Sequence, residues 1–391
     1  MGCTFCSDNL DRVVEYNWHV PNLGTRNIGF AVCRECGLVQ QNPALTQPEL
    51  DRYYKEQAVY TNPGRGGEPD PRNVAMVNEQ LNFIKRGLGF VPKKILQIGS
   101  SDGYTLSVFK KNGAQMVSGI EPTVSSCEFA KKKYQIDCVN SSIENYELLT
   151  SFNLILLTHV LEHITDPLKV LKKCKESQKD LNKGYIYVEV PLLDFDHALC
   201  PGFFSMEHKF YFSRNKINRL IHDAGYLPIS HIEHSQAEIY PIIGILACSS
   251  NFAESSNELK NEYLEAKNFL TRFFSDDLKY WQECYSKILP ILSEANNLYV
   301  WGAGAHTSQL FSNTQLLSEF NLAGILDSSE DKWGLNMGNW TCLNPKEVSF
   351  RSGDVILISS YNSENEIYES TKKLREEGVK TIKFHSLEDS L

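Results

Sequence analysis

The chain has 391 residues, of which 42% are hydrophobic and 22% charged, and its formal net charge is −9. That length predicts two or three domains, and the composition is that of an ordinary globular protein. An acidic chain without a basic patch argues against nucleic acid as the main partner, and no apolar run approaches the roughly 18 residues that a membrane span requires.

The start of the chain has neither the basic residues nor the apolar core of a secretory signal. We therefore expect a cytoplasmic protein without a membrane partner. In a reducing compartment its 11 cysteines are expected to be metal ligands or buried thiols rather than disulfides.

The order of patterns along the chain predicts an α/β protein of several units. A parallel, doubly wound sheet is expected where apolar strands alternate with amphipathic helices. The predicted units are a cysteine-bearing, substrate-side region at 1–75, an α/β core at 76–252, a helical linker at 253–296 and a second Rossmann-like unit at 297–391. Strands of the core are predicted within 94–99, 115–122, 152–159, 184–191 and 240–248.

Two C-x2-C pairs in the first unit predict a metal site. Cys3 and Cys6 form one pair, and Cys33 and Cys36 form the other, 26 residues further on. Four thiolates in two such turns close a tetrahedral zinc shell with no open position, so we expect structural zinc rather than a catalytic ion.

A glycine turn follows the first strand of the core. Gly99 and Gly103 allow a sharp turn and close approach of a ligand to the backbone. Glu121 ends the second strand, 22 residues after Gly99, where a carboxylate accepts hydrogen bonds from ribose hydroxyls. Three residues separate the glycines, so the dinucleotide pattern G-x-G-x-x-G is not present.

This turn resembles the first motif of class I S-adenosylmethionine (SAM) methyltransferases. The resemblance implies a class I Rossmann-like methyltransferase core that binds SAM. Asp102 is expected to contact the amino-acid end of the cofactor, and Ser142, which follows a third strand, is expected near adenine. The predicted cofactor-binding residues are Gly99, Ser100, Asp102, Gly103, Glu121, Pro122, Ser142 and His159.

A second polar group follows the strand at 152–159. His159, Glu162 and His163 come just beyond its carboxyl end, where open α/β sheets bind ligands. Further on, an aromatic-rich loop contains Glu207 and His208. A histidine suits a general base because its ordinary pKa lies near neutrality, although a surface histidine beside the next helix explains the residue type equally well.

In this order, the four cysteines, the SAM motif, Val-Leu-Glu-His at 160–163, Glu-His-x-x-Tyr-Phe-Ser at 207–213 and a C-terminal Rossmann-like unit resemble the sugar C-methyltransferases of deoxysugar biosynthesis. Those enzymes methylate C3 of a nucleotide-linked 4-keto-6-deoxysugar through an enolate. The resemblance implies that His208 is the base with Glu207 beside it, that Tyr54 or Tyr60 contacts substrate, and that Tyr211 lies in the substrate site.

Two segments depart from that family. Ser205 stands where the family commonly has tyrosine, and residues 237–250 lack its Gly-Gly-Ser/Thr-x-Arg segment. These departures leave the sugar and the methylated atom open.

The C-terminal unit opens with Gly302 and Gly304, followed by Thr307 where a dinucleotide fold has its third glycine. We expect this turn and His306 to contact the diphosphate of a nucleotide sugar, since a helix amino terminus favours phosphate. The other readings are O- or N-methylation of a similar metabolite, an NAD-dependent sugar reductase that uses this turn, and a zinc adaptor without activity. A monomer or weak homo-oligomer is expected.

Overall fold

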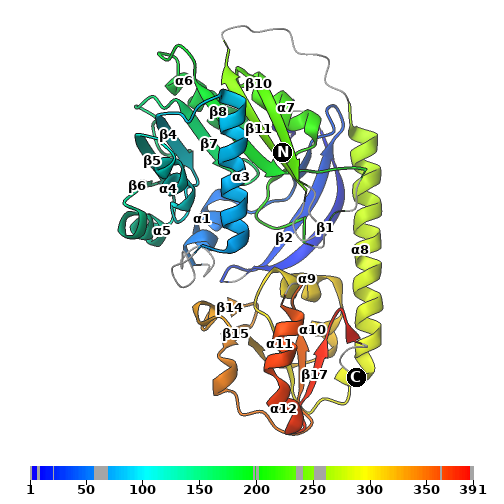
Figure 1. The fold of residues 1–391 in the computed structure, drawn as a ribbon. Helices are drawn as coiled ribbons and strands as arrows, with labels where there is room; N and C mark the ends of the chain where they lie inside the picture. Colours follow the sequence, from blue (N-terminus) through cyan, green and yellow to red (C-terminus); the bar gives the residue numbers. More distant parts are fainter. Residues whose placement is uncertain are drawn as a thin grey trace.

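A computed structural model describes residues 2–6, 9–20, 22–56, 69–196, 199, 202–234, 241–250, 261–361 and 363–387. Three sheets build the described part of the chain, and one long helix runs beside the first sheet and the C-terminal unit (Figure 1). None of the helices in the ranges just given is long and apolar enough to cross a bilayer.

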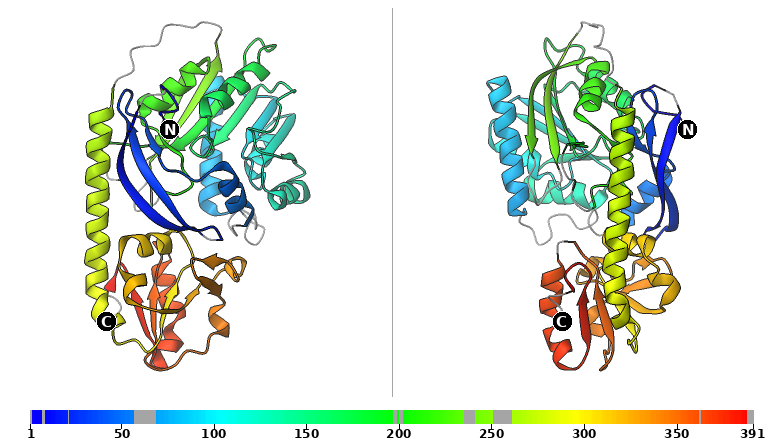
Figure 2. Two further views of the ribbon diagram at one scale, coloured as in Figure 1. Left: turned by 180° about the vertical axis from the view of Figure 1, so that it is seen from behind. Right: turned by 90° about the vertical axis from the view of Figure 1, so that its right-hand side faces the viewer.

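The first sheet is antiparallel and lies beside the central unit (Figure 2). Its order is β1-β2-β3-β9, so the last strand comes from a distant part of the chain. The strands are β1 (Leu10–Val20), β2 (Gly24–Cys33), β3 (Val39–Gln41) and β9 (Phe210–Tyr211). The helix α1 (Gln47–Glu56) follows β3.

The central sheet has seven strands in the order β10-β11-β8-β7-β4-β5-β6. The strands are β4 (Lys94–Ile98), β5 (Met116–Glu121), β6 (Asp137–Asn140), β7 (Leu154–Thr158), β8 (Tyr185–Pro191), β10 (Tyr226–His234) and β11 (Ile242–Ser249). Every strand predicted in this region is present. The sheet is not wholly parallel, however, because β11 runs antiparallel to β8, and β10 antiparallel to β11.

Helices cover both faces of this sheet and bury its apolar residues. α3 (Pro71–Leu88) and α4 (Tyr104–Lys111) pack on one face, in a core that includes Leu81 and Phe109. α6 (Pro167–Ser177) and α7 (Arg214–Asp223) pack on the other face with the cysteine loops. α5 (Val124–Phe129) and a π-helical turn, Ala130–Tyr134, connect β5 to β6. α3 begins at Pro71, so the central unit starts a few residues before the predicted boundary.

α8 (Tyr263–Leu292) occupies the segment predicted as a helical linker. Its first half packs against the first sheet, where Phe274 stacks on Phe30 with ring centroids 5.1 Å apart. Its second half contributes Trp281 and Ile288 to the core of the C-terminal unit. The helix is therefore part of two cores rather than a spacer between them.

The C-terminal sheet has the order β14-β15-β13-β12-β16-β17. Its strands are β12 (Leu298–Trp301), β13 (Leu322–Leu326), β14 (Asn336–Met337), β15 (Trp340–Leu343), β16 (Val355–Ile358) and β17 (Lys380–Lys383). Its helices are α9 (Ala305–Asn313), α10 (Leu316–Glu319), α11 (Glu364–Ser370) and α12 (Lys372–Glu376). β12 pairs in parallel with both β13 and β16, which confirms a second Rossmann-like unit.

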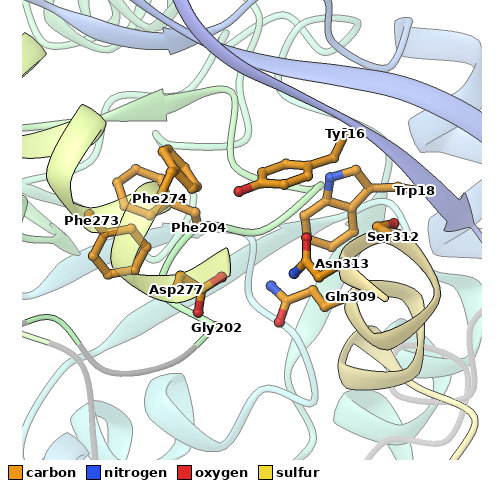
Figure 3. A pocket seen from close by; sticks show the side chains of 10 residues that line it. All are labelled: Tyr16, Trp18, Gly202, Phe204, Phe273, Phe274, Asp277, Gln309, Ser312 and Asn313. Carbon is orange, nitrogen blue, oxygen red and sulfur yellow. The ribbon is translucent and has the colours of Figure 1, made fainter. Parts of the chain in front are cut away.

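The first sheet and the C-terminal unit touch through α9. Ser308 Oγ donates to the carbonyl of His19, and Ser312 Oγ donates to that of Asn17, both at 2.6 Å. Beside this contact, a cavity of about 20 Å3 lies between β1, α8 and α9 (Figure 3).

Candidate functional site

The glycine turn after β4 has the backbone that its sequence predicts. Gly99 has a φ of +67°, and Gly103, which precedes α4, has a φ of +80°. A Cβ on Gly99 would lie 2.4 Å from Cγ2 of Val160, and a Cβ on Gly103 would lie 2.7 Å from that of Ala130. Both positions therefore require glycine for conformation and for space.

Polar groups of the turn face the start of α4. Asp102 Oδ1 accepts a hydrogen bond from the backbone N–H of Tyr104 at 2.9 Å, and burial raises the pKa of Asp102. Ser100 is buried beside Cys138. Asp102 thus caps the first N–H group of α4, while Gly103 has no side chain that could cap the next ones, which leaves them open to a polar ligand group.

Glu121 ends β5 beside this turn. Its Oε2 accepts from the N–H of Ser101 at 2.9 Å, and its Oε1 accepts from the N–H of Thr123 at 3.0 Å. Burial raises the pKa of Glu121, against these two bonds. A carboxylate has about four acceptor positions, so it retains capacity for the two ribose hydroxyls. The arrangement fits the nucleoside end of SAM.

Pro122 and Ser142 lie at the same edge of the sheet. The carbonyl of Pro122 accepts from Asn140 Nδ2 at 2.8 Å, and the carbonyl of Ser142 accepts from the N–H of Asn145 at 3.2 Å. These bonds order the loops that follow β5 and β6, where an adenine contact is predicted.

His159 lies between two buried carboxylates at the end of β7. Its Nδ1 is 3.5 Å from Glu162 Oε1, and its Nε2 is 3.3 Å from Glu189 Oε1. Burial disfavours its cation, but the two carboxylates outweigh that effect and raise the pKa of His159 to about 10. His159 is therefore an imidazolium in an ion cluster, and a contact with cofactor remains a prediction.

His208 stands in a separate position, against the ring of His163. The two ring centroids are 4.8 Å apart and the planes are nearly perpendicular. Burial, together with the proximity of the His163 ring, lowers the pKa of His208 to about 3. His208 is neutral throughout the ordinary pH range, with a free lone pair on one ring nitrogen.

Two tyrosines of α1 reach this group from the first unit. Tyr54 Oη forms a 2.9 Å hydrogen bond with His163 Nδ1, and Tyr53 Oη donates to Glu207 at 2.8 Å. Burial raises the pKa of both phenols well above the usual range. The structure thus brings Tyr54, Glu207 and His208 together, whereas Tyr60 lies outside the described residues; the roles that the resemblance implies for them remain predictions.

Tyr211 lies in a buried environment close to His208. It is 2% exposed, and its hydroxyl bonds to the N–H and the carbonyl of Ser205, both at 3.0 Å. Its ring packs against Phe203 and Phe204. The side chain fixes the loop before His208, and its ring centroid lies 5.9 Å from that of His208, so a contact with substrate remains a prediction.

A larger cavity, of about 430 Å3, opens at the carboxyl ends of β12, β13 and β16. Gly302 has a φ of +129°, and a Cβ there would lie 2.1 Å from the carbonyl oxygen of Ser359. Gly304 begins α9 without a side-chain cap, and Lys332 Nζ lies 3.9 Å from its Cβ position. Asp327 Oδ2 accepts from Lys332 Nζ and from the N–H of Ala303, both at 2.8 Å.

His306 lines this cavity but has both ring nitrogens engaged. Nδ1 is 2.7 Å from Ser359 Oγ, and Nε2 is 2.6 Å from Nε2 of His385. Only 5% of the residue is exposed, and burial lowers its pKa well below the usual value. His306 is therefore part of the cavity wall, and a contact between it and a diphosphate remains a prediction.

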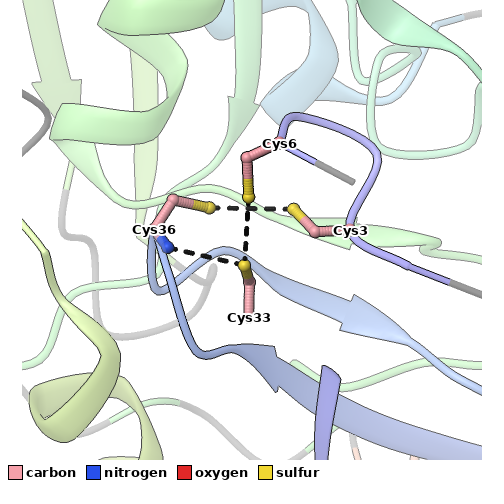
Figure 4. Close-up of side chains that lie close together, drawn as sticks. All are labelled: Cys3, Cys6, Cys33 and Cys36. Carbon is pink, nitrogen blue, oxygen red and sulfur yellow. Dashed lines mark hydrogen bonds between the residues drawn. The ribbon is translucent and has the colours of Figure 1, made fainter. Parts of the chain in front are cut away.

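The four predicted cysteines converge (Figure 4). The sulfurs of Cys3 and Cys36 are 3.7 Å apart, and those of Cys6 and Cys33 are 3.3 Å apart. The N–H of Phe5 donates to Cys3 Sγ at 3.4 Å, as expected for a thiolate. These separations suit zinc–sulfur bonds of about 2.3 Å, so the residues fit the ion.

One important site residue is absent from the sequence-based set. Glu189 lies within the apolar strand β8 and bonds to Tyr187 Oη and Gln80 Nε2, at 2.5 and 2.7 Å. The signal was present, because an isolated acid in a buried strand requires a partner. Tyr53 gave no such signal, since nothing in the pattern of this polar helix distinguishes it from Tyr54 beside it.

Residues 77–231 match the family described as "Methyltransferase domain". Residues 294–383 match the family described as "C2185-like, N-terminal". The first match and the central sheet agree, so the central unit is a class I SAM-dependent methyltransferase domain.

A "Ubiquinone biosynthesis O-methyltransferase" of Actinobacillus pleuropneumoniae serotype 7 is 28% identical over 144 residues, or 34% of this chain and 59% of that protein. A "tRNA U34 carboxymethyltransferase" of Campylobacter hominis is 28% identical over 131 residues, 31% of this chain and 44% of that one. The chain thus spans about three fifths or less of these relatives' length. The structure of a 1,6-didemethyltoxoflavin-N1-methyltransferase from Burkholderia thailandensis superposes on this chain with a TM-score of 0.42 and 14% sequence identity. The match covers 57% of this chain and 96% of that one.

Proposed function

We propose that the protein transfers the methyl group of SAM to a nucleotide-linked 4-keto-6-deoxysugar, at the carbon beside the ketone. One observation carries the proposal: a single loop contacts both the cofactor turn and the proposed base. Val160 of this loop packs against Gly99 of the cofactor turn, and His163 of the same loop packs against the neutral His208. A proton acceptor and the methyl donor would then meet at one edge of the central sheet.

When bound, SAM supplies an electrophilic methyl group on a sulfonium. His208 would take the proton from the carbon beside the ketone. The electron pair left behind would form the new bond to the methyl carbon as the methyl–sulfur bond breaks and S-adenosylhomocysteine leaves. Tyr54 holds His163 against His208 through its 2.9 Å hydrogen bond. A buried site of this kind keeps water from competing with the reaction.

The C-terminal cavity is the proposed seat of the nucleotide. Gly304 at the start of α9 and the ammonium group of Lys332 offer backbone N–H groups and positive charge to a diphosphate. Tyr361 lines this cavity and lies 3.5 Å from the Cβ position of Gly202, in the loop before His208. A ligand that spans both sites would connect the two Rossmann-like units.

O-methylation is the second candidate, because seven similar curated proteins are named as O-methyltransferases. The two reactions differ in the atom that loses a proton. Carbon methylation predicts exchange of deuterium from solvent into the carbon beside the ketone when S-adenosylhomocysteine replaces SAM. Methyl transfer without any such exchange would favour O-methylation of a hydroxyl group.

The first test is calorimetry of the zinc-replete protein with SAM, S-adenosylhomocysteine and NADH, with and without a panel of nucleotide sugars. We expect micromolar binding of the sulfur ligands, strengthened by one nucleotide sugar. Binding of NADH alone would move the chemistry to the C-terminal turn and would contradict the proposal.

His208→Asn tests the acceptor. It should lower turnover about 10²- to 10⁴-fold, the range for loss of a general base, with little change in SAM affinity. His222→Asn, at the end of α7, is the matched control. Turnover within threefold of wild type in His208→Asn would remove His208 from the mechanism.

A further inference from the structure

Glu162, His163 and His208 form a second group of metal-ligand side chains, far from the cysteines in sequence. Each offers one ligand atom, and these atoms lie within 4.8 Å of one another. Two imidazoles with one carboxylate are a ligand set for zinc and similar divalent ions. The metal–ligand bonds are about 2.0–2.2 Å, so the side chains would close by about 1 Å around an ion.

The carboxylate of Glu162 lacks the hydrogen bonds that its burial calls for. The residue is 0% exposed, and among the described residues neither oxygen has a hydrogen-bond partner. Its nearest basic side chain, His159, lies 3.5 Å away and also contacts a second buried carboxylate, Glu189. Glu189 accepts further hydrogen bonds from Tyr187 and Gln80. Glu162 has none from the described part of the chain, and a buried carboxylate in that position favours a bound cation.

The histidines are oriented for coordination. Tyr54 Oη holds His163 at Nδ1, so when that nitrogen donates to the phenol oxygen, Nε2 carries the lone pair. A second hydrogen bond of this kind typically orients histidine ligands of metals. His208 Nδ1 is buried, and no side chain or backbone group of the described part of the chain bonds to it.

We propose that Glu162, His163 and His208 bind one borderline divalent cation, such as Zn²⁺ or Co²⁺, and that this cation inhibits methyl transfer. A nitrogen that coordinates a cation has no lone pair for a proton, so the metal and the substrate proton compete for His208. The binding site stands on the geometry alone, whereas the inhibition rests on the proposed function.

Cobalt titration of protein whose cysteine site is already filled with zinc tests the binding. We expect one further Co²⁺ per chain, with the visible absorption of nitrogen and oxygen ligation and without the intense band of a sulfur-bound ion. His163→Asn and Glu162→Gln should each weaken this binding at least tenfold, and His222→Asn should leave it unchanged.

Absence of a second cobalt, or equal binding by the His163 and Glu162 variants, would overturn the site. If one variant does not fold, the other still gives the result. Inhibition is tested separately: methyl transfer and solvent deuterium exchange should fall together as this second site fills. Cobalt binding with unchanged or faster turnover would refute inhibition, while the calorimetric test of the proposed function would be unaffected.

Discussion

Gly99 is held at a φ of +67°, with Val160 Cγ2 2.4 Å from where a Cβ would lie. Gly99→Ala should therefore cost about 1–3 kcal/mol of stability from backbone strain and displace the loop that carries Glu162 and His163. We expect at least a tenfold loss of SAM affinity by calorimetry.

Two further variants separate strain from steric overlap. Gly113→Ala also imposes strain, at a φ of +112°, but its Cβ meets nothing within 4 Å, so SAM affinity should be kept. Val160→Ala added to Gly99→Ala removes the overlapping methyl group and should recover part of the affinity. Failure of that rescue would show that the overlap is not the cause.

The residues of the site differ in how far sequence could place them. Gly99, Gly103 and Glu121 were predictable because a turn between two strands fixes their positions within a few residues of chain. Tyr211 and His306 were not, because their environments depend on partners such as Ser205 and His385 that other segments supply.

At the scale of elements, the positions of the buried central strands were predictable from the sequence, whereas the edge strand β10 of the central sheet was not. β4, β7 and β8 are almost continuously apolar because they are covered on both faces. β10 alternates between half-buried and exposed residues and contains Pro228, as an edge strand can. The direction of β11 follows from its pairing with β10, which no local pattern in the sequence specifies.

α8 carries a half-buried acid, Asp277, whose ionisation makes the stability of the contact between the first sheet, α8 and α9 depend on pH. Asp277 lines the small cavity in Figure 3, and burial raises its pKa from 3.8 to about 6. Between these two values the folded protein keeps a proton that the unfolded chain has lost. Stability therefore falls as pH rises through this window, and the full cost is present above pH 6 or so.

Asp277→Asn removes that ionisation. We expect the free energy of unfolding in urea to rise by about 2 kcal/mol at pH 7.5 and to change little at pH 4. Asp276→Asn, its exposed neighbour, should have no effect at either pH. An equal increase at both pH values for Asp277→Asn would mean that packing, rather than charge, is responsible.

At the scale of the whole molecule, the units share structure across the boundaries that the sequence indicates. β9 of the central region completes the first sheet, and α8 enters two cores. The pairing of β3 with β9 joins residues about 170 positions apart, such as Val39 and Tyr211, so local patterns do not predict it.

The cysteine site is the clearest case of this sharing. Cys3, Cys33 and Cys36 belong to the same buried cluster as Leu96 and Ile155 of the central sheet. Zinc at these thiolates would therefore stabilise the methyltransferase unit as well as the first sheet. A site confined to its own small domain would stabilise only that domain.

Removal of zinc should accordingly lower SAM affinity and thermal stability together. We expect Cys33→Ser to lose zinc and to lower Tm by about 10 °C or more, since a structural zinc contributes several kcal/mol. Calorimetry with SAM should show a parallel loss of binding. Cys248→Ser, a half-buried thiol outside the cluster, is the control. If Cys33→Ser loses zinc but binds SAM as tightly as wild type, the first unit unfolds independently of the central unit. A shared core would instead destabilise the cofactor turn when zinc is lost.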